Sequence, residues 1–118
     1  MVLVDTSVWV AHLREGTIGL EELLGKGDVV CHPFIVGELA CGNLKNRSEV
    51  LPLLQALTMA IHAEHEEVTE FIENHCLMGK GLGNIDVHLL ASANLSRVQL
   101  WTLDRQLNAV CSKMGLAY

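Results

Sequence analysis

The sequence lacks any long apolar segment. Charged or polar side chains interrupt its apolar stretches every few residues, so none approaches the roughly 20 apolar residues that a membrane-spanning helix needs. The amino-terminal residues Met1–Val4 carry no basic leader, and no small-residue cleavage site follows them. This pattern predicts no signal peptide, and we therefore expect a cytoplasmic protein without membrane association.

Closely spaced cysteines are also absent. The chain has four cysteines but no CxxC pair. Each cysteine lies among apolar neighbours, which predicts buried structural thiols in a reducing compartment rather than a zinc site or disulfides. The four are Cys31, Cys41, Cys76 and Cys111.

Several familiar catalytic motifs are incomplete. The segment His65–Thr69 begins like the metalloprotease motif HExxH, but Thr69 stands where the second histidine is needed. The glycine-rich segment Gly79–Gly83 lacks the spacing of a phosphate-binding P-loop and is interpreted as a mobile loop. Ser7 lacks the flanking glycines of an esterase nucleophile elbow.

Basic residues are scarce. Fourteen acidic residues against eight basic ones give a formal charge of −6, which argues against RNA or DNA binding by the surface as a whole. Five glutamates belong to one expected amphipathic helix, 64–76, and a metal site could convert other acids into affinity for phosphate. The segment Lys45–Arg47 could contact a phosphate or could simply be solvated surface.

The rest of the chain is rich in apolar residues, at 50%, with a mean hydropathy of +0.32, which excludes a disordered protein. Short apolar runs alternate with segments of helical periodicity, and this alternation predicts a single α/β domain over residues 1–118, with a mostly parallel sheet covered by helices on both faces. The expected strands are 1–4, 28–31, 58–61, 98–102 and a short last one at 116–118. The expected helices are 6–14, 18–24, 34–41, 48–57, 64–76, 84–95 and 104–114.

Four carboxylates stand at unusual places in this pattern. Asp5 ends the first strand, Asp86 opens a helix and Asp104 follows the fourth strand. Helix capping explains each aspartate taken singly. Glu38 is harder to explain, because its neighbours along the chain are apolar and an unpaired buried carboxylate is costly.

These carboxylates favour a metal site. If the first and fourth strands are neighbours, Asp5 and Asp104 leave the sheet at the same carboxyl edge, with Asp86 on the crossover helix between them. The charges would repel one another without a cation, and all-oxygen ligands suit Mg²⁺ or Mn²⁺. A cation of this kind supports phosphodiester hydrolysis, because it polarises a phosphoryl oxygen and lowers the pKa of a bound water.

Four segments, in order, resemble the motifs of the PIN-domain family, specifically the VapC-type toxins of bacteria and archaea. The segments are Val2–Trp9, His32–Gly42, Asn84–Ala91 and Leu100–Asp104. The resemblance implies a PIN fold and an Mg²⁺- or Mn²⁺-dependent endoribonuclease that acts as the toxin of a type II toxin–antitoxin system. It also implies a cognate antitoxin and a homodimer as partners.

The resemblance further implies roles for single residues. Asp5, Glu38, Asp86 and Asp104 become the catalytic acidic quartet. Asp5 and Asp86 are then direct metal ligands, while Glu38 and Asp104 act directly or through water. RNA would be cut by in-line attack of water on phosphorus, leaving a 5′-phosphate and a 3′-hydroxyl.

Two hydroxyl residues fit supporting roles in this scheme. Thr6 and Thr102 are expected to orient Asp5 and Asp104, although capping explains Thr6 almost as well. Asn108 departs from the family pattern, because many relatives have a further acid there, and its presence weakens the case for a second metal ion.

Two other functions stay open from the sequence. A catalytically silent PIN module used as a binding scaffold would keep these acids but cleave nothing. A different Mg²⁺-dependent phosphohydrolase, of the haloacid-dehalogenase kind, would share an aspartate at the end of the first strand. It would also need a second aspartate two residues later, where this chain has Ser7.

Overall fold

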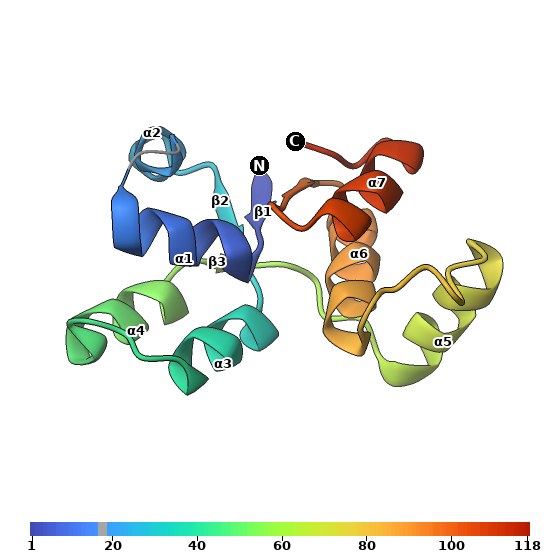
Figure 1. The fold of residues 1–118 in the computed structure, drawn as a ribbon, viewed down its shortest axis with the longest axis horizontal. Coiled ribbons are helices and arrows are strands. Elements are labelled where there is room, and N and C mark those ends of the chain that lie inside the picture. The colour runs from blue at the N-terminus through green and yellow to red at the C-terminus, as the bar shows by residue number, and fades with distance from the viewer. Residues whose placement is uncertain (17–18) are drawn as a thin grey trace.

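A four-stranded parallel sheet forms the centre of the computed structural model, which describes residues 1–16 and 19–118. Its strands lie in the order β3-β2-β1-β4, so β1 is central and neighbours both β2 and β4 (Figure 1). The strands are β1 (Val2–Val4), β2 (Val29–Cys31), β3 (Thr58–Met59) and β4 (Gln99–Trp101).

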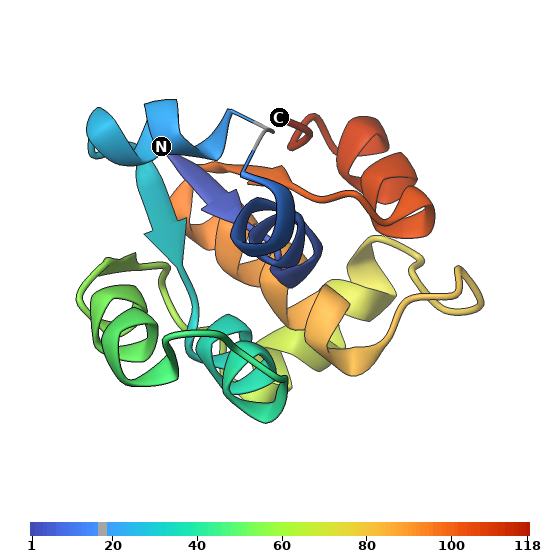
Figure 2. The same cartoon turned by 60° about the vertical axis from the view of Figure 1, so that its left-hand side comes forward.

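Helices cover both faces of the sheet. The chain moves from β1 through β2 to β3 in one direction and then returns across the sheet to β4, and right-handed crossovers place the helices of these two paths on opposite faces. In Figure 2, α1 lies in front of the strands and α6 behind them. The helices of the described residues are α1 (Thr6–Glu15), α2 (Leu20–Gly25), α3 (Pro33–Cys41), α4 (Arg47–Gln55), α5 (His65–Asn74), α6 (Asn84–Ser96) and α7 (Arg105–Lys113).

The strand sequences explain this burial. Val2, Leu3 and Val4 are all buried, as are the three residues of β2, so these strands show no alternation of polar and apolar positions. Continuous apolar runs are typical of parallel strands covered on both faces. The α/β class predicted from the sequence is therefore confirmed.

Local sequence sets the ends of the helices that lead away from the sheet. The helix α1 ends at Glu15 and is followed by Gly16, whose left-handed conformation (φ 70°) lets its N–H donate to the His12 carbonyl. The helix α3 begins at Pro33, which needs no N–H in a first turn, and the Nδ1 atom of His32 accepts the N–H of Phe34.

The pairing of β1 with β4 creates the point where the strand order reverses. Val4 is in register with Trp101, and the N–H of Asp5 donates to the Trp101 carbonyl at 2.9 Å. The two strands thus end side by side. In parallel α/β sheets, ligand sites form outside the carboxyl ends of the strands at such a reversal.

Some expected element limits differ from the structure. The last strand reduces to one isolated bridge, Leu100 to Ala117, and the third strand holds only two residues. The helix expected from residue 18 begins at Leu20, and residues 17–18 lie outside the described part of the chain. The helix expected to reach Cys76 ends at Asn74, because Cys76 has a left-handed backbone (φ 51°).

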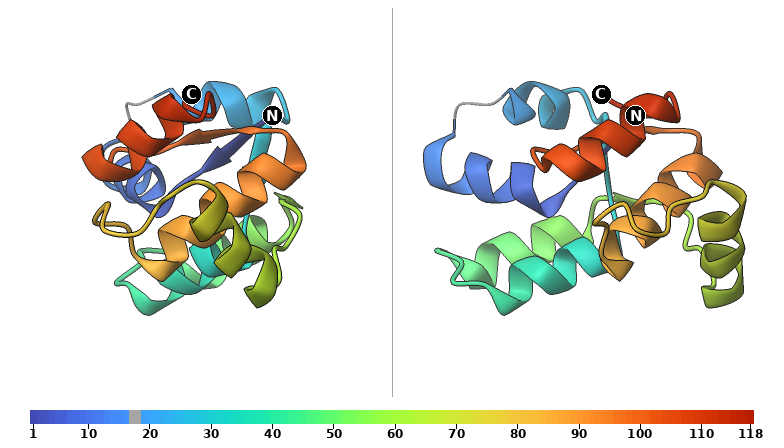
Figure 3. Two further views of the ribbon diagram at one scale, coloured as in Figure 1. Left: turned by 90° about the vertical axis from the view of Figure 1, so that its right-hand side faces the viewer. Right: turned by 45° about the vertical axis from the view of Figure 1, so that its right-hand side comes forward.

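The prediction that all four cysteines are buried is half wrong. Cys31 and Cys111 are buried, whereas Cys41 and Cys76 are exposed because each lies at or just beyond the end of a helix. Within the described residues, no helix combines the length and apolar character needed to cross a membrane. In both panels of Figure 3 the chain termini lie near each other, on the α2 and α7 side of the molecule.

Candidate active site

Asp5 is the most enclosed carboxylate of the predicted quartet, with 7% of its surface exposed. It precedes α1 in extended conformation, but its side chain makes no capping hydrogen bond to that helix. Its Oδ2 atom instead accepts hydrogen bonds from the hydroxyls of Ser7 and Thr102, both at 2.7 Å. Within the described chain no hydrogen bond reaches Oδ1, so this oxygen stays available to a ligand.

A hydroxyl network fixes Asp5 against the end of β4. The Ser7 hydroxyl accepts the N–H of Leu103 at 3.0 Å, and the buried Thr102 hydroxyl accepts the N–H of Asp104 at 3.1 Å. These contacts tie the start of α1 to the segment after β4. Thr102 therefore orients the carboxylate of Asp5 and the backbone, not the carboxylate, of Asp104.

Ser7 was not predicted to support Asp5, because the sequence was compared only with an esterase nucleophile and with the second aspartate of a dehalogenase-like site at this position. The available signal was its position two residues after Asp5 in the first turn of a helix, where a hydroxyl can turn back to a preceding carboxylate.

Glu38 is joined to α1 by a different hydroxyl. The Thr6 hydroxyl donates to Glu38 Oε1 at 2.6 Å, so Thr6 orients Glu38 rather than Asp5. Glu38 is exposed, and the expectation that it is buried was wrong. Ile35 and Leu39 take the buried face of α3, and Glu38 lies on another face although its sequence neighbours are apolar.

Asp86 occupies the first turn of α6 and is half-buried. Its Oδ2 atom accepts the N–H of Gly83 at 3.1 Å. Burial raises the pKa of the Asp86 carboxyl against the lowering effect of this hydrogen bond, and the negative charges of Asp5 and Asp104 raise it further. The three aspartates therefore share one electrostatic environment.

Asp104 is exposed and caps α7, since its Oδ1 atom accepts the N–H of Leu107 at 2.9 Å. The capping interpretation is thus correct for this residue, and a cap leaves its second oxygen unused. Beneath the site, burial and the charges of Asp5 and Asp86 raise the pKa of the Cys111 thiol to about 11. That thiol stays protonated and unreactive.

The donor chemistry of this edge fits a hard divalent cation. Its four carboxylates come from the residues that precede α1 and α7 and from α3 and α6, and all their ligand atoms are oxygens. In the described residues, however, no three His, Cys, Asp or Glu side chains stand close enough to ligate an ion as a ready-made group. Glu38, Asp86 and Asp104 are each held by a local donor, and mutual repulsion separates like charges.

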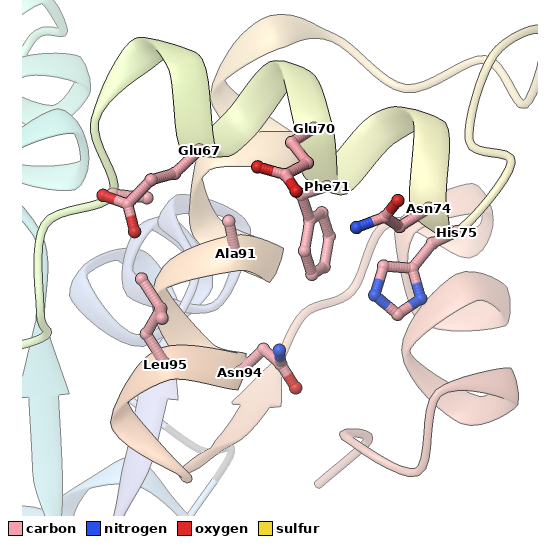
Figure 4. Close-up of a pocket in the computed structure, with 9 residues that line it drawn as sticks. Glu67, Glu70, Phe71, Asn74, His75, Ala91, Asn94 and Leu95 are labelled. Carbon is pink, nitrogen blue, oxygen red and sulfur yellow. The ribbon is translucent and has the colours of Figure 1, made fainter.

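Two hollows lie beside the sheet. A groove of about 570 Å³ begins at Thr6 and Glu38 and runs between α1 and the α3–α4 segment. A smaller cavity of about 230 Å³ lies between α5 and α6, where Figure 4 shows Phe71 between Glu70 and His75. None of the four carboxylates lines the smaller cavity, whereas Glu38 lines the groove, so of these two hollows the groove is the one that reaches the site.

The family assignment follows from a comparison of the whole chain with known protein families. Residues 2–113 match the PIN domain family. This range includes all four carboxylates described above. The chain belongs to the PIN-domain family. The resemblance inferred from the four sequence motifs is therefore confirmed.

Similar proteins agree with this assignment. The chain is 44% identical over 118 residues to Ribonuclease VapC32 of Mycobacterium tuberculosis, in strains CDC 1551 and H37Rv, across 99% of this chain and 95% of the relative. Among solved structures, PAE2754 from Pyrobaculum aerophilum superposes with a TM-score of 0.66 at 18% identity, covering 92% of this chain and 83% of that one. This second likeness concerns the fold alone.

Proposed function

We propose that this protein is an endoribonuclease of the VapC type, the toxin of a type II toxin–antitoxin system. One observation carries the proposal. The parallel pairing of β1 with β4 brings Asp5 and Asp104 to the same sheet edge, where their charges and that of Asp86 act on one another. The named activity of the 44% identical relatives supports RNA as the substrate.

We assign the acidic quartet the task of holding a divalent cation, Mg²⁺ or Mn²⁺. Asp5 and Asp86 are its direct ligands, and Glu38 and Asp104 contact it directly or through water. When bound, the cation would offset negative charge on the scissile phosphate and make a water molecule more acidic.

The protein's own side chains prepare this chemistry. Ser7 and Thr102 hold Oδ2 of Asp5 and leave its Oδ1 toward the ligand. The hydroxyl of Thr6 fixes one oxygen of Glu38, whose exposed carboxylate can orient the attacking water. As the water oxygen bonds to phosphorus, the bond to the 3′ oxygen breaks and that oxygen takes a proton, leaving a 5′-phosphate and a 3′-hydroxyl.

The proposal includes a cognate antitoxin, a homodimer and a cytoplasmic location, where RNA is present. With a formal charge of −6, the protein offers its carboxylates to a basic side chain. An antitoxin that presents an arginine or lysine there would compete with the cation and inhibit cleavage.

The test is RNA cleavage by protein purified free of any antitoxin. Total RNA is incubated with Mg²⁺, with Mn²⁺ or with EDTA, and the ends of the fragments are analysed. We expect cleavage only with metal, producing 5′-phosphate ends. Intact RNA under all conditions would favour a silent PIN scaffold, and hydrolysis of small phosphomonoesters without RNA cleavage would favour another phosphohydrolase.

A further inference from the structure

The groove that leaves the active site differs in charge from the rest of the molecule. Its lining includes Arg14 at the end of α1 and Lys45 in the loop between α3 and α4. Glu38, at the catalytic end, is the only acidic residue among the lining residues that the structure describes. The groove thus presents two of the eight basic residues of an otherwise acidic chain.

Both cations are available to a ligand. Arg14 and Lys45 are exposed, and among the described residues the only ion pair joins Lys26 to Glu22 on α2. An arginine and a lysine without carboxylate partners suit phosphate oxygens, which accept charge-assisted hydrogen bonds.

One wall of the groove is a face of α1 that begins at the catalytic end. Thr6, Val10 and Arg14 follow one another at four-residue steps, so they lie along one face of α1. With a rise of about 1.5 Å per residue, Arg14 stands about 12 Å along the helix from Thr6. Figure 3 shows α1 running above α3 and α4, which form the opposite wall.

Apolar and amide groups complete the lining. Leu13 and Leu44 offer apolar surface, while Asn43 and Asn46 carry amides. The Asn46 side chain makes no capping bond to α4, although Asn46 directly precedes that helix. A chain of alternating phosphates and bases matches such a mixed surface better than a purely apolar peptide does.

We propose that this groove binds the RNA chain on one side of the cleaved bond, with Arg14 and Lys45 as phosphate-contacting positioning residues. The inference rests on the proposed function, because RNA is the substrate proposed for the active site. It explains how an acidic protein gains local affinity for a polyanion. A protein partner in the same groove is the competing occupant.

Binding of RNA by the Arg14→Gln/Lys45→Gln double variant tests the proposal. A fluorescein-labelled single-stranded RNA of mixed sequence is titrated with protein at low ionic strength in EDTA, so that no cleavage occurs, and its anisotropy is measured. We expect the double variant to bind about tenfold more weakly than the parent. The slope of log affinity against log salt should fall by about 1.4, because each lost phosphate contact on a single strand contributes about 0.7.

The matched control is Lys26→Gln/Lys113→Gln, which lowers the net charge equally but at exposed positions outside the groove. It should bind RNA like the parent. Equal loss in both double variants would show a bulk charge effect and overturn the proposal. Unchanged RNA binding by the groove variant with weaker inhibition by the cognate antitoxin would assign the groove to a protein.

A second readout separates this proposal from the proposed function. With bis(p-nitrophenyl) phosphate, a phosphodiester too short to reach the groove, the groove variant should hydrolyse like the parent, whereas its KM for RNA should rise. Hydrolysis reduced equally with both substrates would indicate a distorted site and contradict a positioning role. RNA binding through the groove without metal-dependent RNA cleavage by the parent would refute the endoribonuclease and leave the groove assignment standing.

Discussion

Asp86 shows at the scale of one residue how the active site acts on stability. Its carboxyl is half-buried and faces the charges of Asp5 and Asp104, which together raise its pKa. A carboxyl with a raised pKa in the folded state contributes stability at low pH that is lost as the pH rises through that pKa. Above this range the ionised group destabilises the metal-free protein.

The variant Asp86→Asn should therefore melt at a higher temperature than the parent in EDTA, by a few degrees. The asparagine oxygen can still accept the N–H of Gly83, so the contribution of that hydrogen bond is kept. The upward shift in Tm on adding Mg²⁺ or Mn²⁺ should shrink, because one ligand has lost its charge. Thermal melts with and without metal measure both effects. A lower Tm in EDTA with a full metal response would make Asp86 a simple cap.

A second single residue, His32, makes the stability of the fold depend on pH. It is fully buried, its Nδ1 atom accepts the N–H of Phe34, and its Nε2 atom has no hydrogen-bond partner within the described residues. Burial, with the neighbouring charges of His62 and His88, lowers the pKa of His32 to about 4. The folded state therefore favours the neutral ring.

We expect stability to fall as the pH drops from about 6.5 to about 4, because the unfolded chain then binds a proton that folded His32 refuses. The loss attributable to this residue is up to about 3 kcal/mol. His32→Asn keeps an acceptor for the N–H of Phe34 but cannot titrate. Urea melts across this pH range should therefore show that the free energy of unfolding of the variant decreases less steeply toward low pH. An equally steep decrease in the variant and the parent would contradict the assignment to His32. His88, whose pKa is also lowered by burial, adds to the loss in the same direction.

Some features of single site residues were predictable from the sequence and others were not. Asp5 and Asp104 were predictable as neighbours, because parallel strands place their ends at one edge. The exposure of Glu38 was not, since flanking residues do not reveal which face of a helix a side chain occupies. The Glu38 carboxylate that Thr6 contacts lies 32 residues along the chain, and the Leu103 N–H that Ser7 accepts lies 96 residues away, so the local pattern encodes neither contact.

At the scale of elements, the helix α7 is capped by one of the candidate active-site carboxylates. Asp104 caps this helix through Leu107 while its charge acts on Asp86. In the proposed function the same carboxylate therefore has a structural and a chemical role.

Two substitutions separate these roles of Asp104. Asp104→Asn retains a capping oxygen and should unfold with nearly parental free energy, whereas Asp104→Ala should lose about 1 kcal/mol. Both should cleave RNA more slowly, because both remove the charge. Urea denaturation and cleavage rates provide the comparison. Equal stability of the two variants would exclude the cap, and parental cleavage by Asp104→Asn would exclude the catalytic role.

Element types were more predictable from the sequence than element limits. The alternation of short apolar runs with helical periodicity identified the strands and helices in their correct order. The prediction of a final strand was wrong, because the segment after α7 forms only one isolated bridge, between Ala117 and Leu100. Strand length depends on a neighbour being present along its whole edge, and this is a property of the assembled sheet.

At the scale of the whole molecule, the outer surface retains large apolar side chains. Leu53, Met59 and Ile61 are 69%, 37% and 56% exposed, and Met59 lies on the edge strand β3. Burial of such side chains would stabilise the homodimer that we propose. Light scattering at micromolar concentration should give about twice the chain mass of 12.9 kDa. A monomer throughout that range would refute the proposed homodimer.

The strand order also sets the position of the active site. Because β1 and β4 are adjacent, the carboxyl edge gathers Asp5, Asp86 and Asp104, whereas Asp28 precedes β2 at the opposite, amino edge. The sequence indicated the fold class and the candidate acids. It could not indicate the hydroxyl network that fixes Asp5, since that network exists only once the two strands pair.

Metal-dependent RNA cleavage by Asp5→Asn, compared with Asp28→Asn, tests the central claim most directly. Each variant removes one negative charge from the same sheet with a nearly isosteric side chain, but only Asp5 stands at the proposed metal site. We predict that Asp5→Asn abolishes Mg²⁺- and Mn²⁺-dependent cleavage with its fold intact, and that Asp28→Asn cleaves at the parental rate. Parental cleavage by Asp5→Asn would contradict the proposal that these carboxylates hold the catalytic metal.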